Sequence, residues 1–449
     1  MRLLLNLIYR LLWMAFLPSM AWHWLRGRPL PEASLGRILG LVPRRTSQRP
    51  CLWLHVESLG EVNVLLTLLP HLEARLDGWD IVIAAGTSSG HGLARKRVTR
   101  HRVLFCPIDL PLAAAAVLDR IRPDAIVVVE SARQPHLIAA ARARGIPRTL
   151  VNGRVLARRE TGGGLPPLAE RQMLQNYSSI LAQTPEDAER FTACGVTPAR
   201  IRVGGAVKFD NVQTDRRNPD TQRLARLAGI GQDDIVWLAG STRRGEDQIV
   251  VRVFAAVAHQ FPRLKLILVP RHARRFDHVC RLLERHEIVY ERRTGLETRG
   301  ANPAARALVI DVFGELPAWW GAAHIGFVGN SLTQHGGQNM IEPAAYGVAT
   351  CFGPHTENFQ DVVSLLLRAG GAAVVHSEDE LRSFVRRCLA EPRFAEELGL
   401  RGQAAVASQS GALERTLAHL DEFFARMARP DCRTLTFTKT QRQPALRAA

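Results

Sequence analysis

The sequence lacks the features that mark a metal site, a disulfide-rich protein or a common nucleotide-binding loop. Its seven cysteines are scattered without a CxxC pair, which is typical of reduced thiols in a cytosolic compartment. No Asp-x-Asp pair occurs, so the metal clamp of one large class of nucleotide-sugar enzymes is missing. A Gly-Lys-Ser/Thr phosphate loop is absent, as is a Gly-x-Gly-x-x-Gly turn near the first expected strand. We therefore expect neither a bound metal nor another cofactor.

Acidic residues are scarce relative to basic ones. The 449 residues include 59 Lys and Arg against 42 Asp and Glu, a net charge of +17. Such a surface favours nucleic acid, anionic lipid or a phosphorylated substrate. No basic helix, zinc finger or aromatic RNA-binding strand accompanies the charge, so nucleic acid is the least favoured partner.

The first 28 residues form a separate apolar segment. Leu3–Trp22 is almost wholly apolar, close to the ~20 residues that span a bilayer. Arg26 and Arg28 follow it where a cleavage site would otherwise stand. We expect an N-terminal membrane anchor over residues 1–28, either spanning the bilayer or lying in its interface, with the rest of the chain cytoplasmic. A buried core helix is the alternative.

Short apolar, β-branched runs alternate with longer amphipathic stretches along the rest of the chain. Continuous apolar strands separated by helices indicate parallel sheets covered on both faces. We predict an α/β protein of two Rossmann-like domains facing a cleft, residues 35–212 and 213–425, joined by a polar linker at 211–222 and followed by a basic tail at 430–449. The expected strands are 51–56, 80–85, 102–106, 125–129, 149–152 and 179–183, then 235–239, 265–270, 287–290, 307–311, 325–329, 349–352 and 372–375.

The most informative motif lies at Gly336–Pro343. Two adjacent glycines let a backbone approach a ligand closely, and the expected helix start that follows favours an anion. Asn339 opens that turn. Glu342 lies about one turn further on and can reach paired hydroxyls such as those of a ribose. A phosphate and a sugar held side by side indicate a nucleotide.

Other charged residues follow expected strands or end the first domain. Glu61 stands in the first turn of an expected helix that Ser58 caps. It is a candidate general base, and the alternative is a first-turn Glu favoured by the helix dipole. Lys208 can reach a leaving phosphate or a substrate acid, and the alternative is a lysine paired with Asp210.

Cations follow the second expected strand of the second domain. Arg271 and His272, with Arg274 and Arg275, come directly after it. Arginine suits bidentate phosphate binding, and the alternative is a solvated basic loop. The Ser241-Thr242 pair, after the preceding strand, is a weak signal by itself.

Taken together, these motifs resemble the 3-deoxy-D-manno-octulosonic acid (Kdo) transferase family. Each motif is modest, but they match in order, and the resemblance extends to about residue 425. The matching motifs are His55…Ser58-Leu59-Gly60-Glu61, Asn152-Gly153-Arg154, Ala182-Gln183-Thr184, Arg190-Phe191, Lys208-Phe209-Asp210, Gly240-Ser241-Thr242, Pro270-Arg271-His272, Gly314-Glu315-Leu316, Asn339…Glu342-Pro343 and Gly353-Pro354-His355…Asn358-Phe359.

The resemblance implies a GT-B glycosyltransferase anchored in the bacterial inner membrane, with a cytoplasmic active site and no essential metal. Such an enzyme moves Kdo from CMP-Kdo to the lipid A precursor (lipid IVA) in lipopolysaccharide biosynthesis, with inversion at the anomeric carbon. Glu61 would be the general base, and Glu130 and Lys208 would stabilise the transition state. The partners would be CMP-Kdo, the precursor glycolipid and an anionic membrane surface, without nucleic acid. The implied CMP-binding residues are Ser241, Thr242, Arg271, His272, Phe313, Gly314, Glu315, Gly337, Asn339, Met340, Ile341, Glu342 and Asn358.

The chain departs from the family pattern after Glu130. The family usually has a second Glu and then Trp-Pro-Asn, whereas Ala132–His136 reads Ala-Arg-Gln-Pro-His here. Arg243 and Gln338 each replace a family His, and Ala206 replaces an Asn. The altered segment belongs to the acceptor side, so we expect it to affect the acceptor. Two alternatives stay open: a GT-B-like nucleotide-sugar epimerase, and an inactive relative that binds nucleotide or glycolipid.

Overall fold

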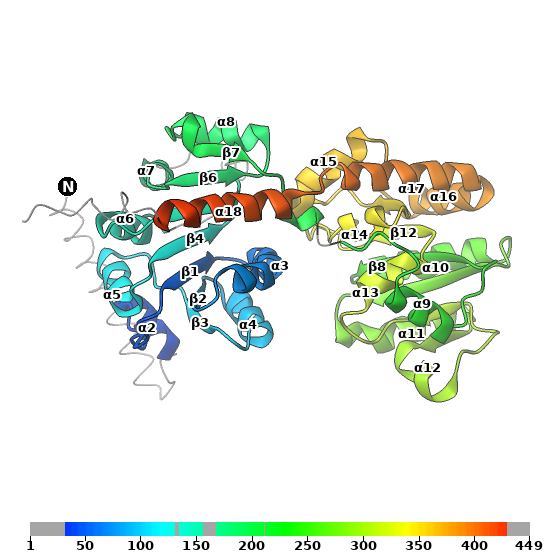
Figure 1. Cartoon of the computed structure of the whole chain (residues 1–449). Helices are drawn as coiled ribbons and strands as arrows, with labels where there is room; N and C mark the ends of the chain where they lie inside the picture. Colours follow the sequence, from blue (N-terminus) through cyan, green and yellow to red (C-terminus); the bar gives the residue numbers. More distant parts are fainter. Residues whose placement is uncertain (1–31, 131–133, 156–167, 211, 429–449) are drawn as a thin grey trace, which may run out of the picture. The chain divides into compact units, whose positions relative to one another are not determined.

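The computed structural model describes residues 32–130, 134–155, 168–210 and 212–428. These residues form two compact α/β units (Figure 1), one comprising the chain up to Val207 and from Gly411 onward, the other Lys208–Ser410. Within the described ranges, no helix combines the length and the apolar character needed to cross a membrane. The expected anchor at 1–28 and the expected tail at 430–449 lie outside the described residues.

The first unit is built on a seven-stranded parallel sheet of order β3-β2-β1-β4-β5-β6-β7. Every residue of the two central strands β1 and β4 is buried, as expected for strands with helices on both faces. The strands are β1 (Cys51–Val56), β2 (Asp80–Ala85), β3 (Arg102–Phe105), β4 (Ala125–Val129), β5 (Arg148–Gly153), β6 (Ser179–Ala182) and β7 (Ile201–Val203). The helices are α2 (Glu32–Leu39), α3 (Leu59–Arg75), α4 (Ser88–Arg97), α5 (Pro111–Ile121), α6 (Pro135–Ala143), α7 (Leu168–Leu174), α8 (Pro185–Ala193) and the 3-10 helix η2 (Pro198–Arg200).

The second unit repeats this plan with the order β10-β11-β9-β8-β12-β13-β14. In both sheets the strand order reverses beside the first strand, which is where open parallel sheets bind ligands. The strands are β8 (Ile235–Thr242), β9 (Leu264–Pro270), β10 (Tyr290–Arg292), β11 (Ala307–Val309), β12 (Ile325–Val328), β13 (Ala349–Phe352) and β14 (Ala373–Val374). The helices are α9 (Pro219–Leu227), α10 (Glu246–Ala258), α11 (Phe276–Arg285), α12 (Arg293–Arg299), α13 (Leu316–Ala322), α14 (Ile341–Ala345), α15 (Gln360–Arg368), α16 (Glu378–Ala390) and α17 (Pro392–Ala407), with the 3-10 helices η4 (Ala273–Arg275) and η5 (Glu357–Phe359), and η3 (Val207–Phe209) at the boundary of the units.

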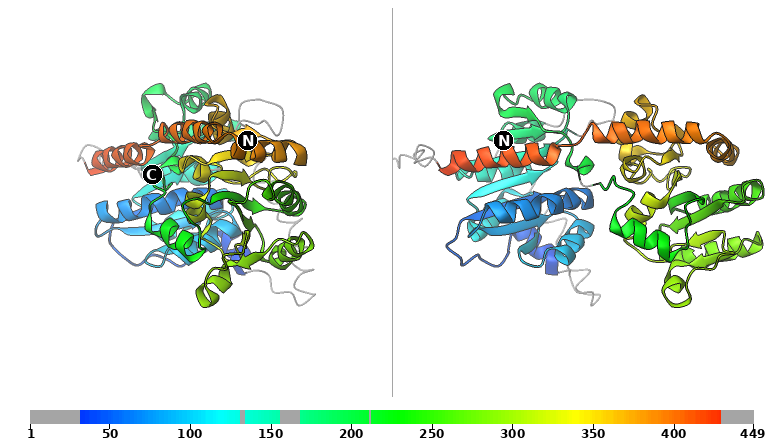
Figure 2. Two further views of the ribbon diagram at one scale, coloured as in Figure 1. Left: turned by 90° about the vertical axis from the view of Figure 1, so that its right-hand side faces the viewer. Right: turned by 45° about the vertical axis from the view of Figure 1, so that its right-hand side comes forward.

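The last described helix, α18 (Ala412–Ala428), packs on the first unit, against α3, β5 and β6. Figure 2 shows it lying along that sheet. The His419 Nε2 atom is 3.0 Å from Thr149 Oγ1 and 3.1 Å from Ser179 Oγ, and burial lowers the pKa of His419 to about 4. The expected second domain, residues 213–425, included most of this helix. The apolar period of a helix shows that one face is buried but not which sheet covers it.

Three local expectations also differ from the structure. The sequence missed β7, which is three residues long and largely exposed. Helix α9 begins inside the expected linker because Asn218 caps it, accepting the Thr221 N–H at 2.9 Å. Strand β10 begins at Tyr290 rather than 287, since Glu287 has a φ of 55° that ends extended structure there.

Candidate active site

In the second unit, the loops after four parallel strands gather at one edge of the sheet and bond to one another. The Arg271 N–H donates to the Thr242 carbonyl at 2.9 Å, which joins the loops after β8 and β9. The Gly353 N–H donates to Ser331 Oγ at 2.8 Å and the His355 N–H to the Ser331 carbonyl at 2.9 Å. These bonds join the loops after β12 and β13, so most of the expected donor motifs share one edge.

Glu246, the first residue of α10, fastens this edge. Its fully buried carboxylate accepts four backbone N–H groups: Arg243 at 3.0 Å, Asn330 at 2.6 Å, Ser331 at 2.8 Å and Leu332 at 2.9 Å. A buried carboxylate needs such donors. Glu246 therefore stabilises the fold through these bonds. The sequence alone does not reveal this role, because the long-range partners of Glu246 have no local signal.

The loop ends after β8 and β9 bring cations together around His272. The pKa of His272 is lowered by partial burial and by the charges of Arg243, Arg274 and Arg271. We refer to these three as the arginine cluster. The Arg243 side chain is partly exposed, and its buried Nε has no hydrogen-bond partner among the described residues. Arg243 was noted in the sequence only as a family substitution, and the structure adds it to the candidate site.

Two other charged residues of this edge are paired within the protein. Arg275 Nε and Nη2 lie 2.9 and 2.6 Å from one oxygen of the fully buried Asp247. Glu315, a predicted CMP-binding residue, accepts from Arg293 Nε at 2.8 Å and Nη2 at 2.7 Å, and from Trp319 Nε1 at 3.2 Å. Both side chains therefore hold the loops in place.

The end of β8 and the loop after β11 present mainly backbone and an aromatic ring. Ser241 has a φ of 57° and Thr242 is fully buried, so this turn is tight. Phe313 is 68% exposed, with its ring 5.9 Å from that of Phe276. A side chain at Gly314, whose φ is 95°, would meet no atom within 4 Å. The exposed ring and open backbone form a surface on which a flat base can stack.

The glycines of the Gly336–Pro343 stretch are required by the loop itself. Gly336 and Gly337 have φ values of 82° and 77°, and a Cβ at Gly336 would lie 2.2 Å from Asn358 Nδ2. The Gly337 N–H donates to the Asn330 carbonyl at 2.7 Å, and Asn330 Nδ2 donates back at 3.0 Å. The loop is thus closed around Asn330.

Asn339 organises the short helix α14 that follows. Its Oδ1 accepts the Ile341 N–H at 3.0 Å, and its Nδ2 donates to Glu342 Oε1 at 3.0 Å. Met340 and Ile341 are buried. Burial raises the pKa of Glu342, partly offset by the Asn339 hydrogen bond. A helix of five residues has a small dipole and one of its first N–H groups is already bonded, so the arginine cluster is the stronger anion-binding element.

In the first unit, the corresponding edge carries carboxylates. Glu61 lies in the first turn of α3 and is 4% exposed. Its N–H donates to Ser58 Oγ at 3.3 Å, and its Oε2 accepts the Glu57 N–H at 2.5 Å. The expected Ser58 cap is confirmed, and the Glu61 carboxylate binds the N–H of the residue before that cap.

Glu130 follows β4 at the same edge, with a φ of 66°. Its Oε1 lies 2.5 Å from Arg154 Nε in an ion pair. Lys208, expected at the end of the first domain, is the first residue of the second unit. It pairs with Asp361 on α15, and its ammonium lies 5.4 Å from the centre of the Phe209 ring.

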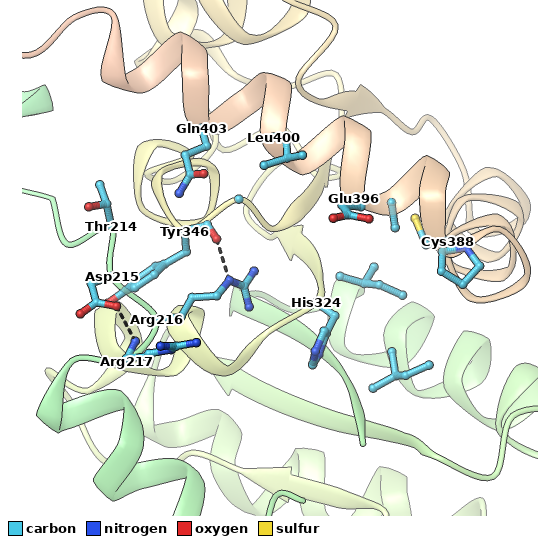
Figure 3. Close-up of a pocket in the computed structure, with 15 residues that line it drawn as sticks. Thr214, Asp215, Arg216, Arg217, His324, Tyr346, Cys388, Glu396, Leu400 and Gln403 are labelled. Carbon is cyan, nitrogen blue, oxygen red and sulfur yellow. Dashed lines mark hydrogen bonds between the residues drawn. The ribbon is translucent and has the colours of Figure 1, made fainter. Parts of the chain in front are cut away.

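A cavity of about 640 Å³ lies at the opposite edge of the second sheet (Figure 3). Ile235 and Ile325, the first residues of β8 and β12, line it, and no predicted site residue does. Arg216 lies at its wall, where its Nε donates to the Tyr346 carbonyl at 2.8 Å. Arginines and carboxylates both line this cavity, so its charges do not select a nucleotide.

Comparison with known proteins matches the chain to one family. The family described as "3-Deoxy-D-manno-octulosonic-acid transferase (kdotransferase)" matches residues 33–211. The 3-deoxy-D-manno-octulosonic acid transferase of Haemophilus influenzae is 30% identical over 379 residues, which cover 84% of this chain and 87% of that protein. The transferase of the same name from Bordetella pertussis is 32% identical over 382 residues, covering 83% and 87%.

Solved structures support the fold. A putative UDP-N-acetylglucosamine 2-epimerase from Listeria monocytogenes aligns over 84% of this chain and 97% of its own, with a TM-score of 0.55 at 15% identity. A glycosyltransferase from Rickettsia africae aligns over 86% of this chain with a TM-score of 0.54 at 12% identity. At this identity the likeness concerns architecture alone. The expectation of two parallel α/β sheets in a GT-B-like fold is confirmed.

Proposed function

Because the chain belongs to the Kdo transferase family of glycosyltransferases, we propose that it moves Kdo from CMP-Kdo to the lipid A precursor (lipid IVA) in lipopolysaccharide biosynthesis. We propose further that the transfer inverts the anomeric carbon and needs no metal. The observation that carries this proposal is the separation of charge between the two sheets. Cations gather at the ligand-binding edge of the second unit, and carboxylates gather at that of the first.

The second unit would bind the donor. The arginine cluster can hold the CMP phosphate, because guanidinium groups bind phosphate through two hydrogen bonds at once. Glu342, oriented by Asn339, would accept from the ribose hydroxyls. The exposed ring of Phe313 would face the cytosine base. The remaining predicted CMP residues supply backbone and packing around these contacts.

The first unit would supply the base. Glu61 would take the proton of an acceptor hydroxyl as that oxygen attacks the anomeric carbon. The bond between this carbon and the phosphate oxygen breaks, and CMP leaves with the electron pair. The sugar's own carboxylate stabilises the positive charge that develops beside it, so the protein's main task is to receive the phosphate charge. Lys208 and Glu130 would assist through their charges.

The proposed Kdo transfer would take place at the cytoplasmic side of the bacterial inner membrane. The proposed acceptor is a phosphorylated glycolipid, and the net charge of +17 suits an anionic membrane surface. Residues 1–28 would hold the chain there. Removing them should shift the purified protein from membrane vesicles to the supernatant in a sedimentation assay, and unchanged sedimentation would contradict this part of the proposal.

The direct test incubates the purified full chain with CMP-Kdo and tetra-acylated lipid A precursor. We expect release of CMP and a glycolipid whose mass, measured by mass spectrometry, has increased by at least one Kdo residue. An epimerase, the second candidate, would change the sugar without an acceptor and leave the glycolipid mass unchanged. An inactive relative would bind CMP without turnover. Absence of both CMP release and Kdo-lipid product would refute the proposal.

A further inference from the structure

Glu57 places a carboxylate at the acceptor-side edge that the proposed mechanism does not use. It directly follows β1, and its side chain is 25% exposed. Its Oε1 lies 3.2 Å from His55 Nε2 and 3.5 Å from Gln134 Nε2. His55 is buried beneath it. Protein groups therefore contact the carboxylate on one side, and the rest of the side chain is exposed to solvent.

The neighbouring strand leaves room for this carboxylate. Gly86 follows β2, which pairs with β1, and its N–H donates to the Val56 carbonyl at 2.9 Å. A Cβ at Gly86 would lie only 1.9 Å from Glu57 Oε2. Any other residue at position 86 would displace the Glu57 side chain, so the two positions fit as a pair.

The charges around Glu57 keep it ionised. Burial works against ionisation, but His55, Gln134 and Arg37 hold the pKa of Glu57 below its ordinary value. Burial also disfavours a charged His55, yet contacts with Cys106 and Glu57 raise the pKa of His55 overall. An ionised carboxylate with an open side is an acceptor of hydrogen bonds from a ligand.

Glu57 also connects to the segment that departs from the family pattern. Gln134 belongs to this altered segment, Ala132–His136. Gln134 reaches Glu57 and donates to the Pro107 carbonyl at 3.3 Å. Strand β4, which precedes this segment, pairs with β1. A contact with Gln134 thus joins Glu57 to the altered segment.

We propose that Glu57 binds the acceptor sugar: its carboxylate accepts hydrogen bonds from hydroxyl groups beside the one that Glu61 deprotonates, and so it determines which acceptor the enzyme uses. One hydrogen bond ties the two residues, since Glu61 Oε2 accepts the Glu57 N–H. This inference rests on the proposed transferase function and on the first unit taking the acceptor. It assigns a role in acceptor specificity to Glu57, which contacts the segment where this chain departs from the family pattern.

The test measures KM and kcat for acceptor and donor separately in the full chain. Glu57→Gln should raise the KM for lipid A precursor about tenfold, the scale of one hydrogen bond to a charged group. The KM for CMP-Kdo should stay within about twofold, as for a residue that touches only one substrate. Glu57→Asp, which keeps the charge, should recover part of the loss.

Glu73→Gln is the matched control, because Glu73 also pairs with a histidine, His101 at 2.6 Å, on a side chain of similar exposure, 31%. It should leave both KM values unchanged. The inference is overturned if wild type transfers Kdo but Glu57→Gln keeps the acceptor KM of wild type. It is also overturned if Glu57→Gln and Glu57→Asp impair both substrates equally. A wild-type protein without transfer would refute the proposed function itself.

Discussion

The ligand-binding edges of the two sheets have the same geometry but leave opposite charges for a ligand. In the second unit, two acidic side chains are bonded within the fold: Glu246 accepts four backbone N–H groups, and Asp247 pairs with Arg275. The arginine cluster remains. In the first unit, Glu130 is paired with Arg154 and Glu61 is almost fully buried, whereas the carboxylate of Glu57 remains partly exposed.

The comparison teaches that the charge a site offers depends on which groups the fold has already paired. Near the end of β8, for example, acidic and basic residues are equally common, with Arg243 and Arg244 beside Glu246 and Asp247. In our proposal, the bonds inside each unit distinguish an edge that binds phosphate from an edge suited to proton removal and sugar binding. The predictions below alter one edge at a time, in order of expected effect.

The largest effect is expected for Glu61→Gln, which removes the base but keeps an oxygen that can accept the Glu57 N–H. The kcat of Kdo transfer should fall by about 1,000-fold, within the range for loss of a general base. The measurement is CMP release at saturating substrates. If this variant retained more than about a tenth of wild-type turnover, Glu61 would be only a first-turn carboxylate favoured by the helix dipole.

The next effect is on folding. Glu246→Ala leaves four backbone N–H groups without their acceptor, and at least about 3 kcal/mol of unfolding free energy should be lost. Urea unfolding measures this loss.

Glu378→Ala is the control for that experiment. Glu378 is likewise the first residue of a helix, α16, but its partner Arg252 is largely exposed. Its removal should change little. Equal losses in the two variants would mean that the buried network of Glu246 has no special role.

A third effect concerns the donor. Arg271→Ala and Arg243→Ala should each raise the KM for CMP-Kdo about tenfold, as expected for loss of one charged hydrogen bond. Arg244→Ala, which changes an exposed residue of the same loop, should not. Arg275→Ala should instead lower the melting temperature, because it leaves Asp247 buried without its cation. If all four variants changed the KM and the melting temperature alike, the arginine cluster would not differ from arginines that only stabilise the fold.

The smallest effect is pH-dependent. Burial raises the pKa of Glu342 above its ordinary value of 4.5, so ionised Glu342 costs folding free energy at high pH and none below the ordinary value. Glu342→Gln should therefore be at least as stable as wild type at pH 8, with the difference vanishing as the pH falls toward 4. Its CMP affinity should nevertheless fall about fivefold, as for one weakened hydrogen bond. Melting curves and CMP titration at both pH values check this, and lower stability at pH 8 would contradict it.

Much of the fold could be predicted from sequence, because parallel strands covered on both faces are continuous apolar runs. Ala125–Val129 is such a run, and it forms β4 with every residue buried. The course of α18 could not be predicted. Its contacts with Thr149 and Ser179 join residues about 240 to 270 positions apart, and no local pattern encodes them.

The candidate site, like the fold, could be predicted from the sequence only in part. The sequence could indicate that Arg271, Glu61 and Glu342 stand at strand ends or in first helical turns, since these positions have local signals. It could not indicate that the Glu315 carboxylate is held by Arg293, nor that Glu246 closes two loops. Those roles depend on which distant groups the fold brings within bonding distance.

The most direct test of the account is a CMP titration of Glu61→Gln and Arg271→Ala by calorimetry under identical conditions. The account predicts that Glu61→Gln binds CMP within about twofold of wild type, while Arg271→Ala binds about tenfold more weakly. Equal weakening by both variants, or unchanged binding by Arg271→Ala, would contradict the division between a nucleotide-binding edge and a catalytic edge.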